Sequence, residues 1–172
     1  MLVEKIIGNW FENPLLEYLE IDKLMLEWHE TTKRIIRKSS QNGRDVAIRR
    51  QNNQPLLDGD ILNETETEVL IIDILPCDVI CICPQNMSEM AILCYEIGNR
   101  HAPIFIENDV VMLPFDAPMF RLLTANGFRP ERDFRKLTNR LPTSVTANHA
   151  HEVGDSEKEN LFTKILKMTQ KT

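Results

Sequence analysis

The chain has 172 residues, 42% hydrophobic and 27% charged, with a formal net charge of −6 and an isoelectric point of about 5.3. This length allows one or two domains with a modest core. The acidic balance disfavours nucleic acid as a partner, and no apolar run approaches the roughly 20 residues that cross a bilayer. The N-terminus lacks the pattern of a signal peptide, so we expect a cytoplasmic protein, with no membrane partner, whose four cysteines stay reduced.

The first 75 residues predict short strands joined by tight turns. Strands are expected at residues 2–7, 24–28, 35–39, 45–49 and 69–75. Asn42-Gly43 is a strong hairpin signal between two of them. Glu64, Glu66 and Glu68 alternate with threonines, which would place three carboxylates on one solvated strand face. We therefore expect an all-β N-terminal domain over residues 1–75, serving as a partner- or peptide-binding domain.

After Pro76 the pattern mixes helices with strands. Strands are expected at 78–83, 103–106, 110–113 and 128–137, and helices at 86–97 and between Asp116 and Gly127. The capping-box pair Asn86 and Glu89 opens the first helix. The order strand, helix, strand, strand, helix, strand is that of a ferredoxin-like βαββαβ domain. The fold class is thus α+β, with this domain over residues 76–141 providing metal binding and dimerisation.

The composition becomes polar after Leu141-Pro142, as in a linker or tail. Ser156 and Glu159 form a second capping-box pattern before a short amphipathic run. We expect residues 142–172 to be a flexible tail that carries His149 and His151 and has room for one short helix.

One histidine, His101, follows directly on the first predicted helix. The apolar face of that helix is predicted to contain Met87, Met90, Ala91, Cys94 and Ile97. Gly98 suits the left-handed residue that ends a helix, and Pro103 lets a strand begin. His101 is therefore expected on a rim between two elements, where loops present functional side chains. The pattern by itself leaves open whether this histidine is a ligand or a solvated loop residue.

The segment from Tyr95 to His101 resembles the GNRH segment of the UreE family of urease accessory proteins, which are nickel metallochaperones. Further matching segments follow the family's order and include Leu26-Glu27-Trp28, residues 43–49, residues 58–62 and a histidine in the tail. The resemblance covers about residues 1–152. It implies a homodimer in which His101 binds Ni²⁺ at the two-fold axis. It also implies delivery of the metal to the urease apoprotein assembly complex through a GTPase called UreG.

Symmetry and the tail would complete the metal site. A single imidazole is too little, but a two-fold axis brings His101 together with its own copy. His149 and His151 point the same way in an extended chain and could close on the same ion. We therefore assign His101, His149 and His151 as metal ligands, and leave open which tail histidine dominates. Neutral imidazole suits both nickel and zinc, so Zn²⁺ remains a second candidate metal.

The chain departs from the family at two points. Many relatives end in a histidine-rich tract, whereas this tail holds two histidines, which favours one ion per dimer over metal storage. Glu96 stands where many relatives carry histidine, and we expect it to tune the site or to be solvated. Arg100 is expected to form a salt bridge or hydrogen bond that holds the turn.

Other residues of chemical interest have plainer interpretations. Cys77, Cys81, Cys83 and Cys94 lack the usual zinc-site spacing and are predicted to be buried structural thiols. The basic segment 33–50 is either a solvated hairpin face or a docking surface for an acidic partner. Because no catalytic constellation is found, we expect no enzyme. The alternatives are a peptide-binding scaffold with incidental metal binding and a small metal-dependent enzyme that uses His101 and Glu96.

Overall fold

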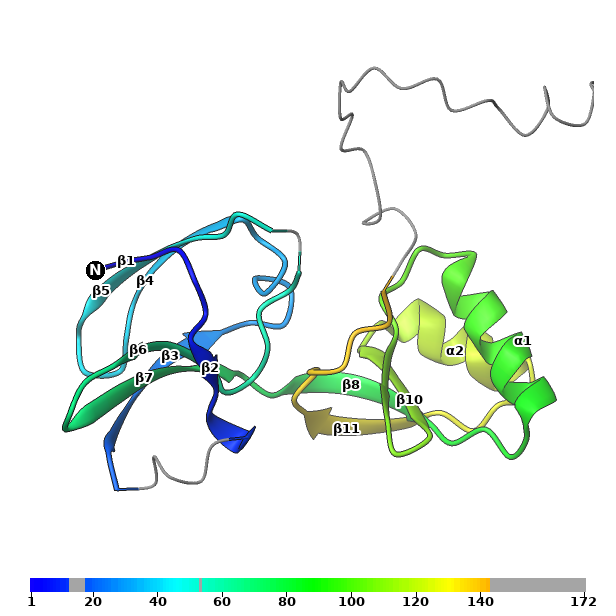
Figure 1. Cartoon of the computed structure of the whole chain (residues 1–172). Helices are drawn as coiled ribbons and strands as arrows, with labels where there is room; N and C mark the ends of the chain where they lie inside the picture. Colours follow the sequence, from blue (N-terminus) through cyan, green and yellow to red (C-terminus); the bar gives the residue numbers. More distant parts are fainter. Residues whose placement is uncertain (13–17, 53, 143–172) are drawn as a thin grey trace, which may run out of the picture. The chain divides into compact units, whose positions relative to one another are not determined.

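Short strands with alternating apolar residues build the N-terminal domain. The computed structural model describes residues 1–12, 18–52 and 54–142, and in it these strands form two sheets, with orders β1-β5-β4 and β2-β6-β7-β3 (Figure 1). The strands are β1 (Leu2–Val3), β2 (Gly8–Asn9), β3 (Glu20–Leu26), β4 (Ile35–Ser39), β5 (Asp45–Arg49), β6 (Asp60–Glu64) and β7 (Glu68–Ile74). One 3-10 turn, η1 (Trp10–Glu12), interrupts them. The β-rich N-terminal domain expected from the sequence is confirmed.

The apolar run of β7 is explained by its central place. Leu70, Ile72 and Ile74 belong to a core that also includes residues of β4 and β5 from the other sheet. Val69 and Ile71 belong to a second cluster with Trp10. The sequence of a strand that is buried on both faces is a continuous run of apolar residues.

Two strand predictions in this domain need correction because pairing overrides local pattern. Residues 2–7 do not form one strand. Instead, β1 pairs with β5, and the chain then changes sheets, so that β2 pairs with β6. The strand expected at 24–28 is β3, which begins at Glu20 and ends at Leu26. Its polar first half is held by parallel pairing with β7 along all seven residues.

Two further predictions in this domain, a hairpin turn and a strand, had different outcomes. The Asn42-Gly43 hairpin is confirmed between β4 and β5, with Gly43 at a φ of 81°. The single glutamate-bearing strand over 64–68 is wrong, because Thr65 makes a turn between β6 and β7 there. Its hydroxyl oxygen accepts the Glu68 N–H at 3.0 Å. A hydroxyl that bonds nearby backbone in this way favours a turn over a strand.

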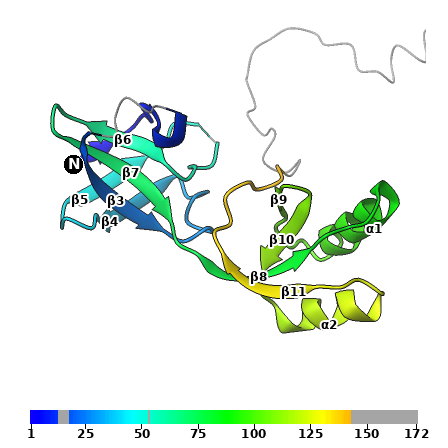
Figure 2. The same cartoon turned by 90° about the horizontal axis from the view of Figure 1, so that it is seen from below.

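The C-terminal domain has the predicted ferredoxin-like topology. Its elements are β8 (Cys77–Ile82), α1 (Met87–Gly98), β9 (Phe105–Glu107), β10 (Val110–Pro114), α2 (Ala117–Ala125) and β11 (Glu131–Arg135). The strand order is β11-β8-β10-β9, and all neighbours are antiparallel. Both helices pack on one face of this sheet, against Ile80, Ile82 and Val111 (Figure 2).

Trp28 covers the other face of that sheet and connects it to the N-terminal core. Its ring meets Phe105 edge-on, with centroids 5.8 Å apart and an interplanar angle of 84°. The same indole packs against the core of the N-terminal domain. The ammonium group of Lys136 adds an ion pair to Asp58, 3.0 Å away, and a second to Asp73. One aromatic side chain therefore serves two hydrophobic clusters.

The double role of Trp28 predicts a large loss of stability on truncation. Trp28→Ala should lower the free energy of unfolding by about 2 kcal/mol, because Trp28 is half-buried and truncation of fully buried aromatics costs about 3–5 kcal/mol. Guanidinium denaturation followed by circular dichroism measures the effect. Tyr18→Ala is the matched control, because Tyr18 is exposed, and surface changes usually stay within about 0.5 kcal/mol. Equal losses in both variants would contradict this role.

Candidate metal centre

Helix α1 positions the candidate ligand and begins at the predicted cap. The side chain of Asn86 accepts the Glu89 N–H at 2.9 Å, and Glu89 in turn accepts the Gln85 N–H at 2.8 Å. The buried face is shifted from the predicted one. Leu93 and Ile97 are fully buried, with Met90 and Cys94 packed beside them, whereas Met87 and Ala91 are exposed.

The turn after α1 is tight, and His101 rather than Gly98 is its left-handed residue. Gly98 is the last residue of the helix, and its place as the left-handed helix stop is therefore a wrong prediction. His101 has a φ of 54°, and its N–H donates to the Gly98 carbonyl at 2.9 Å. Histidine is one of the few non-glycine residues enriched in this region. The imidazole is exposed at the end of α1, as expected.

Glu96 and Arg100 neutralise each other beside this turn. The guanidinium of Arg100 lies 3.5 Å from the Glu96 carboxylate and donates to the Glu96 carbonyl at 3.4 Å. The salt bridge predicted for Arg100 is therefore present, and it spans the last turn of the helix. It occupies the carboxylate that the metal-dependent enzyme alternative would use.

An apolar stripe formed by Ile92 and Tyr95 lies on the outward side of α1, the helix that precedes the turn with His101. Ile92 and Tyr95 are 54% and 68% exposed, and three-residue spacing places them on one face of the helix. Met87, at the start of the helix, is 82% exposed. Large exposed apolar side chains gathered in this way mark interaction surfaces.

The electrostatic setting of His101 suits a cation. The C-terminal end of a helix carries roughly half a negative charge from its free carbonyl groups. In the described part of the chain, no group of three or more His, Cys, Asp or Glu side chains could hold a metal ion. A metal site built on His101 therefore draws further ligands from another copy or from outside the described residues. His149 and His151 lie outside the described residues.

The four cysteines were predicted to be buried, and they differ in how far this holds. Cys81 is buried and Cys77 and Cys94 are half-buried, and burial raises the pKa of all three thiols. Cys83 is exposed, so the prediction is wrong for this residue. It follows the last residue of β8, where the sheet no longer covers it.

The basic segment 33–50 is largely paired with acids from elsewhere in the domain. The carboxylate of Glu30 lies 2.5 Å from the Lys38 ammonium and 3.3 Å from that of Lys33. Further pairs are Arg37 with Asp45, Arg44 with Glu68, and Arg49 with Glu4. These pairs favour a charge-balanced hairpin surface over a docking site for an acidic partner. Most of the acids come from other parts of the sequence, which is why the segment looked uncompensated.

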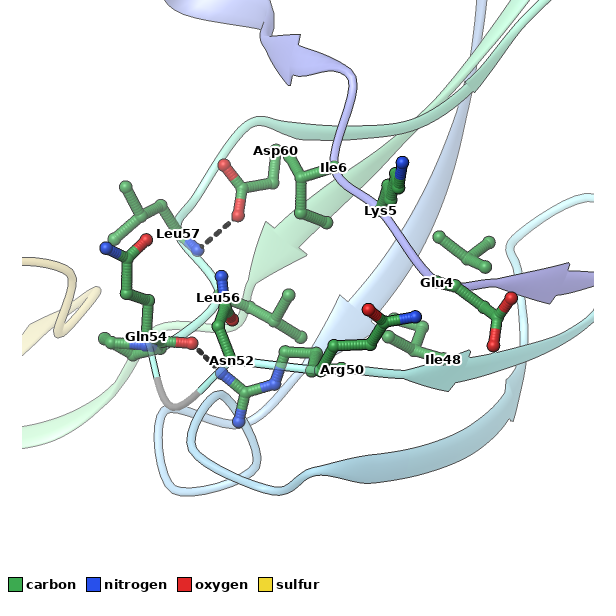
Figure 3. A pocket seen from close by; sticks show the side chains of 13 residues that line it. Glu4, Lys5, Ile6, Ile48, Arg50, Asn52, Gln54, Leu56, Leu57 and Asp60 are labelled. Carbon is green, nitrogen blue, oxygen red and sulfur yellow. Dashed lines mark hydrogen bonds between the residues drawn. The ribbon is translucent and has the colours of Figure 1, made fainter. Parts of the chain in front are cut away.

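A cavity in the N-terminal domain was not predicted. It has a volume of about 590 Å³ and lies where the chain leaves β1, over the apolar side chains of Ile48 and Leu56. Asp60 accepts the Leu57 N–H there at 2.8 Å, and Arg50 donates to the Gln54 carbonyl (Figure 3). Burial raises the pKa of Asp60. The scaffold alternative would use this cavity.

Comparison with known proteins agrees with the two-domain fold. Residues 3–75 match the family model "UreE urease accessory protein, N-terminal domain", and residues 77–160 match the C-terminal domain of the same family. A urease accessory protein UreE from Flavobacterium johnsoniae is 41% identical over 99% of this chain and 100% of its own length. The UreE proteins of Acetivibrio thermocellus and Helicobacter hepaticus are 42% and 37% identical, each over 88% of this chain and over 99% and 89% of their own lengths.

The fold and the matches define an accessory protein rather than an enzyme. The chain belongs to the UreE family of urease accessory proteins. Neither of the helices in the described ranges is long and apolar enough to cross a membrane.

The pairing of Glu30 predicts a pH dependence of stability. Burial raises the pKa of Glu30, but hydrogen bonds from Lys38, the Glu27 N–H and Lys33 outweigh it and lower the pKa from 4.5 to about 2. A depressed pKa in the folded state contributes stability above pH 4.5, which is lost as the pH falls towards 2. The melting temperature of Glu30→Gln should therefore lie below that of wild type at neutral pH and converge with it near pH 2.

Thermal unfolding by circular dichroism across this pH range measures the difference. Glu66→Gln is the control, because Glu66 is an exposed turn residue, and it should change the melting temperature little at any pH. A gap between Glu30→Gln and wild type that persists undiminished at pH 2 would rule out this contribution.

Proposed function

We propose that this protein is a homodimeric nickel carrier that binds Ni²⁺ at a site centred on two copies of His101. The observation that carries the proposal is the exposed imidazole in the turn that follows α1, the helix that carries the apolar stripe. Two copies that bury this stripe against each other about a two-fold axis bring the two His101 side chains together. Family membership supports the same function.

Dimerisation would remove the exposed apolar side chains of the stripe from water. Burying apolar surface contributes roughly 25 cal/mol per Å², and Ile92 and Tyr95 offer such surface next to the candidate ligand. The Arg100–Glu96 pair holds the turn without occupying the imidazole. A preformed turn lowers the ordering cost of metal binding.

The remaining ligands are assigned to His149 and His151. Both lie outside the described residues, and the chain enters this segment from Leu141, whose N–H donates to the Ile104 carbonyl at 2.7 Å. The last described residues therefore lie beside Ile104, which is three residues after His101 in the sequence. Ligands on separate segments can leave the ion one at a time, which suits a carrier that must release its cargo.

The carrier would act in the cytoplasm and pass Ni²⁺ to the urease apoprotein assembly complex through a UreG-type GTPase. Imidazole ligands also accept zinc, so Zn²⁺ would compete for the site. The β-rich N-terminal domain would take part in binding these partners.

Nickel binding should depend on His101 and not on another exposed histidine. His101→Ala should weaken nickel affinity by on the order of 100-fold, because loss of groups that merely orient a ligand already costs about 10- to 100-fold. His29→Ala is the matched control, because His29 is also exposed in a turn, and it should leave the affinity unchanged. Isothermal titration with Ni²⁺ measures both, and an unchanged affinity in His101→Ala would end the proposal.

The α1 stripe should hold the dimer together. Ile92→Asp places a charge in the proposed interface and should yield monomers, because burying an unpaired charge is costly. Light scattering coupled to size-exclusion chromatography gives the mass. Ile35→Asp, at an exposed position of β4, should remain dimeric. A wild-type protein that is monomeric with nickel bound, or a dimer unaffected by Ile92→Asp, would refute this interface.

The tail should contribute ligands and nothing to dimerisation. A chain ending at Val145 lacks both tail histidines and should bind nickel more weakly while it stays dimeric. A chain ending at Glu152 keeps both histidines and removes only the predicted amphipathic run, so it should bind like wild type. Titration calorimetry and light scattering on the two truncations test this, and equal nickel affinity in both would exclude His149 and His151.

A further inference from the structure

Cys81 and Cys83 present two thiols to one small cavity on the C-terminal sheet. Cys81 lies in β8 and Cys83 follows the last residue of that strand, and side chains two residues apart in an extended chain point to the same side. Both line a cavity of about 200 Å³. Cys81 is 6% exposed and Cys83 is open to solvent, so a small ion could reach the pair from outside.

The walls of this cavity are cationic. Arg129 and Arg135 line it together with a single carboxylate, that of Glu131. The Arg135 guanidinium is also 2.5 Å from the Asp133 carboxylate, outside the cavity lining. Guanidinium groups stabilise a negatively charged complex and oppose the entry of an uncompensated divalent cation.

The spacing suits an ion bridge better than a disulfide. Residues two apart in a strand have Cα atoms about 6.6 Å apart, near the upper limit of roughly 6.8 Å for a disulfide. Both thiols are free. Metal–thiolate bonds of about 2.3 Å let one ion join sulfurs up to ~4.6 Å apart.

We propose that Cys81 and Cys83 form a two-coordinate site for a monovalent thiophilic cation, Cu⁺, separate from His101. Thiolates select this soft ion. Two thiolates and one Cu⁺ make a complex of charge −1, which together with the Glu131 carboxylate balances the two guanidinium groups that line the cavity. Zinc would require four ligands, and the described residues contain no cluster of three or more His, Cys, Asp or Glu side chains to supply them. Binding releases both thiol protons to solvent, and no electron is transferred because the copper enters as Cu⁺.

Anaerobic competition with a chromophoric Cu⁺ chelator tests the site in the full chain. Wild type should withdraw one Cu⁺ per chain from the chelator. Cys83→Ser should weaken this affinity by at least about 100-fold, since the variant loses a direct ligand and loss of merely orienting groups costs about 10- to 100-fold. Because Cys83 is exposed, this variant should fold even if Cys81→Ser does not. Full affinity in a folded Cys83→Ser overturns the proposal.

Matched cysteine variants exclude the other thiols. The Cys94 sulfur lies 3.8 Å from that of Met90 and is the competing soft pair, and Cys77 lies on the same strand as the proposed site. Cys94→Ser and Cys77→Ser should both keep wild-type Cu⁺ affinity, and loss in either contradicts the assignment. His101→Ala should also keep Cu⁺ affinity, so this test stands or falls independently of the nickel site.

Discussion

The constraint on which the C-terminal domain depends is that β8 must bury both of its faces. Ile80 and Ile82 point into the cluster under the helices, while Val79 and Cys81 point into the cluster on the opposite side. The strand is central in its sheet, between β11 and β10. An apolar central strand of this kind is stable only when a layer covers each face, since each fully buried aliphatic side chain contributes about 1.5–3 kcal/mol.

The two covering layers explain the placement of the functional surface. On one side, α1 uses Leu93 and Ile97 for the core, which leaves Ile92 and Tyr95 facing outward. On the other side, Trp28 closes the sheet and couples it to the N-terminal core. The helix that protects the sheet thus also carries the apolar stripe, and the turn with His101 follows it. In the proposed dimer, a second copy of the same stripe would complete its burial.

Charge is balanced locally at the basic hairpin and at the turn after α1, and this affects which ligands each surface can bind. The basic hairpin is matched by Glu4, Glu30 and Glu68, and Arg100 is matched by Glu96. The imidazole of His101 is therefore left beside a helix end with a partial negative charge and a neutralised neighbour pair. That setting agrees with a proposed site that holds a divalent cation and lets it go. The arginine-lined cysteine cavity has the opposite electrostatic character and would suit an anionic thiolate complex.

The sequence by itself determined the two domain types, the order of elements in the C-terminal domain, the cap at Asn86 and the exposed turn at His101, because these follow from local periodicity and turn chemistry. The family assignment likewise came from the residues around that turn. Only the tertiary structure decided where β3 begins, that Trp28 bridges two cores, and that Gly98 is helical while His101 adopts the left-handed conformation. It also decided which acids pair with the basic hairpin and that Cys83 is exposed. These features depend on contacts between residues far apart in the chain, or on which residues near a turn become buried. The local sequence pattern carries no information about either.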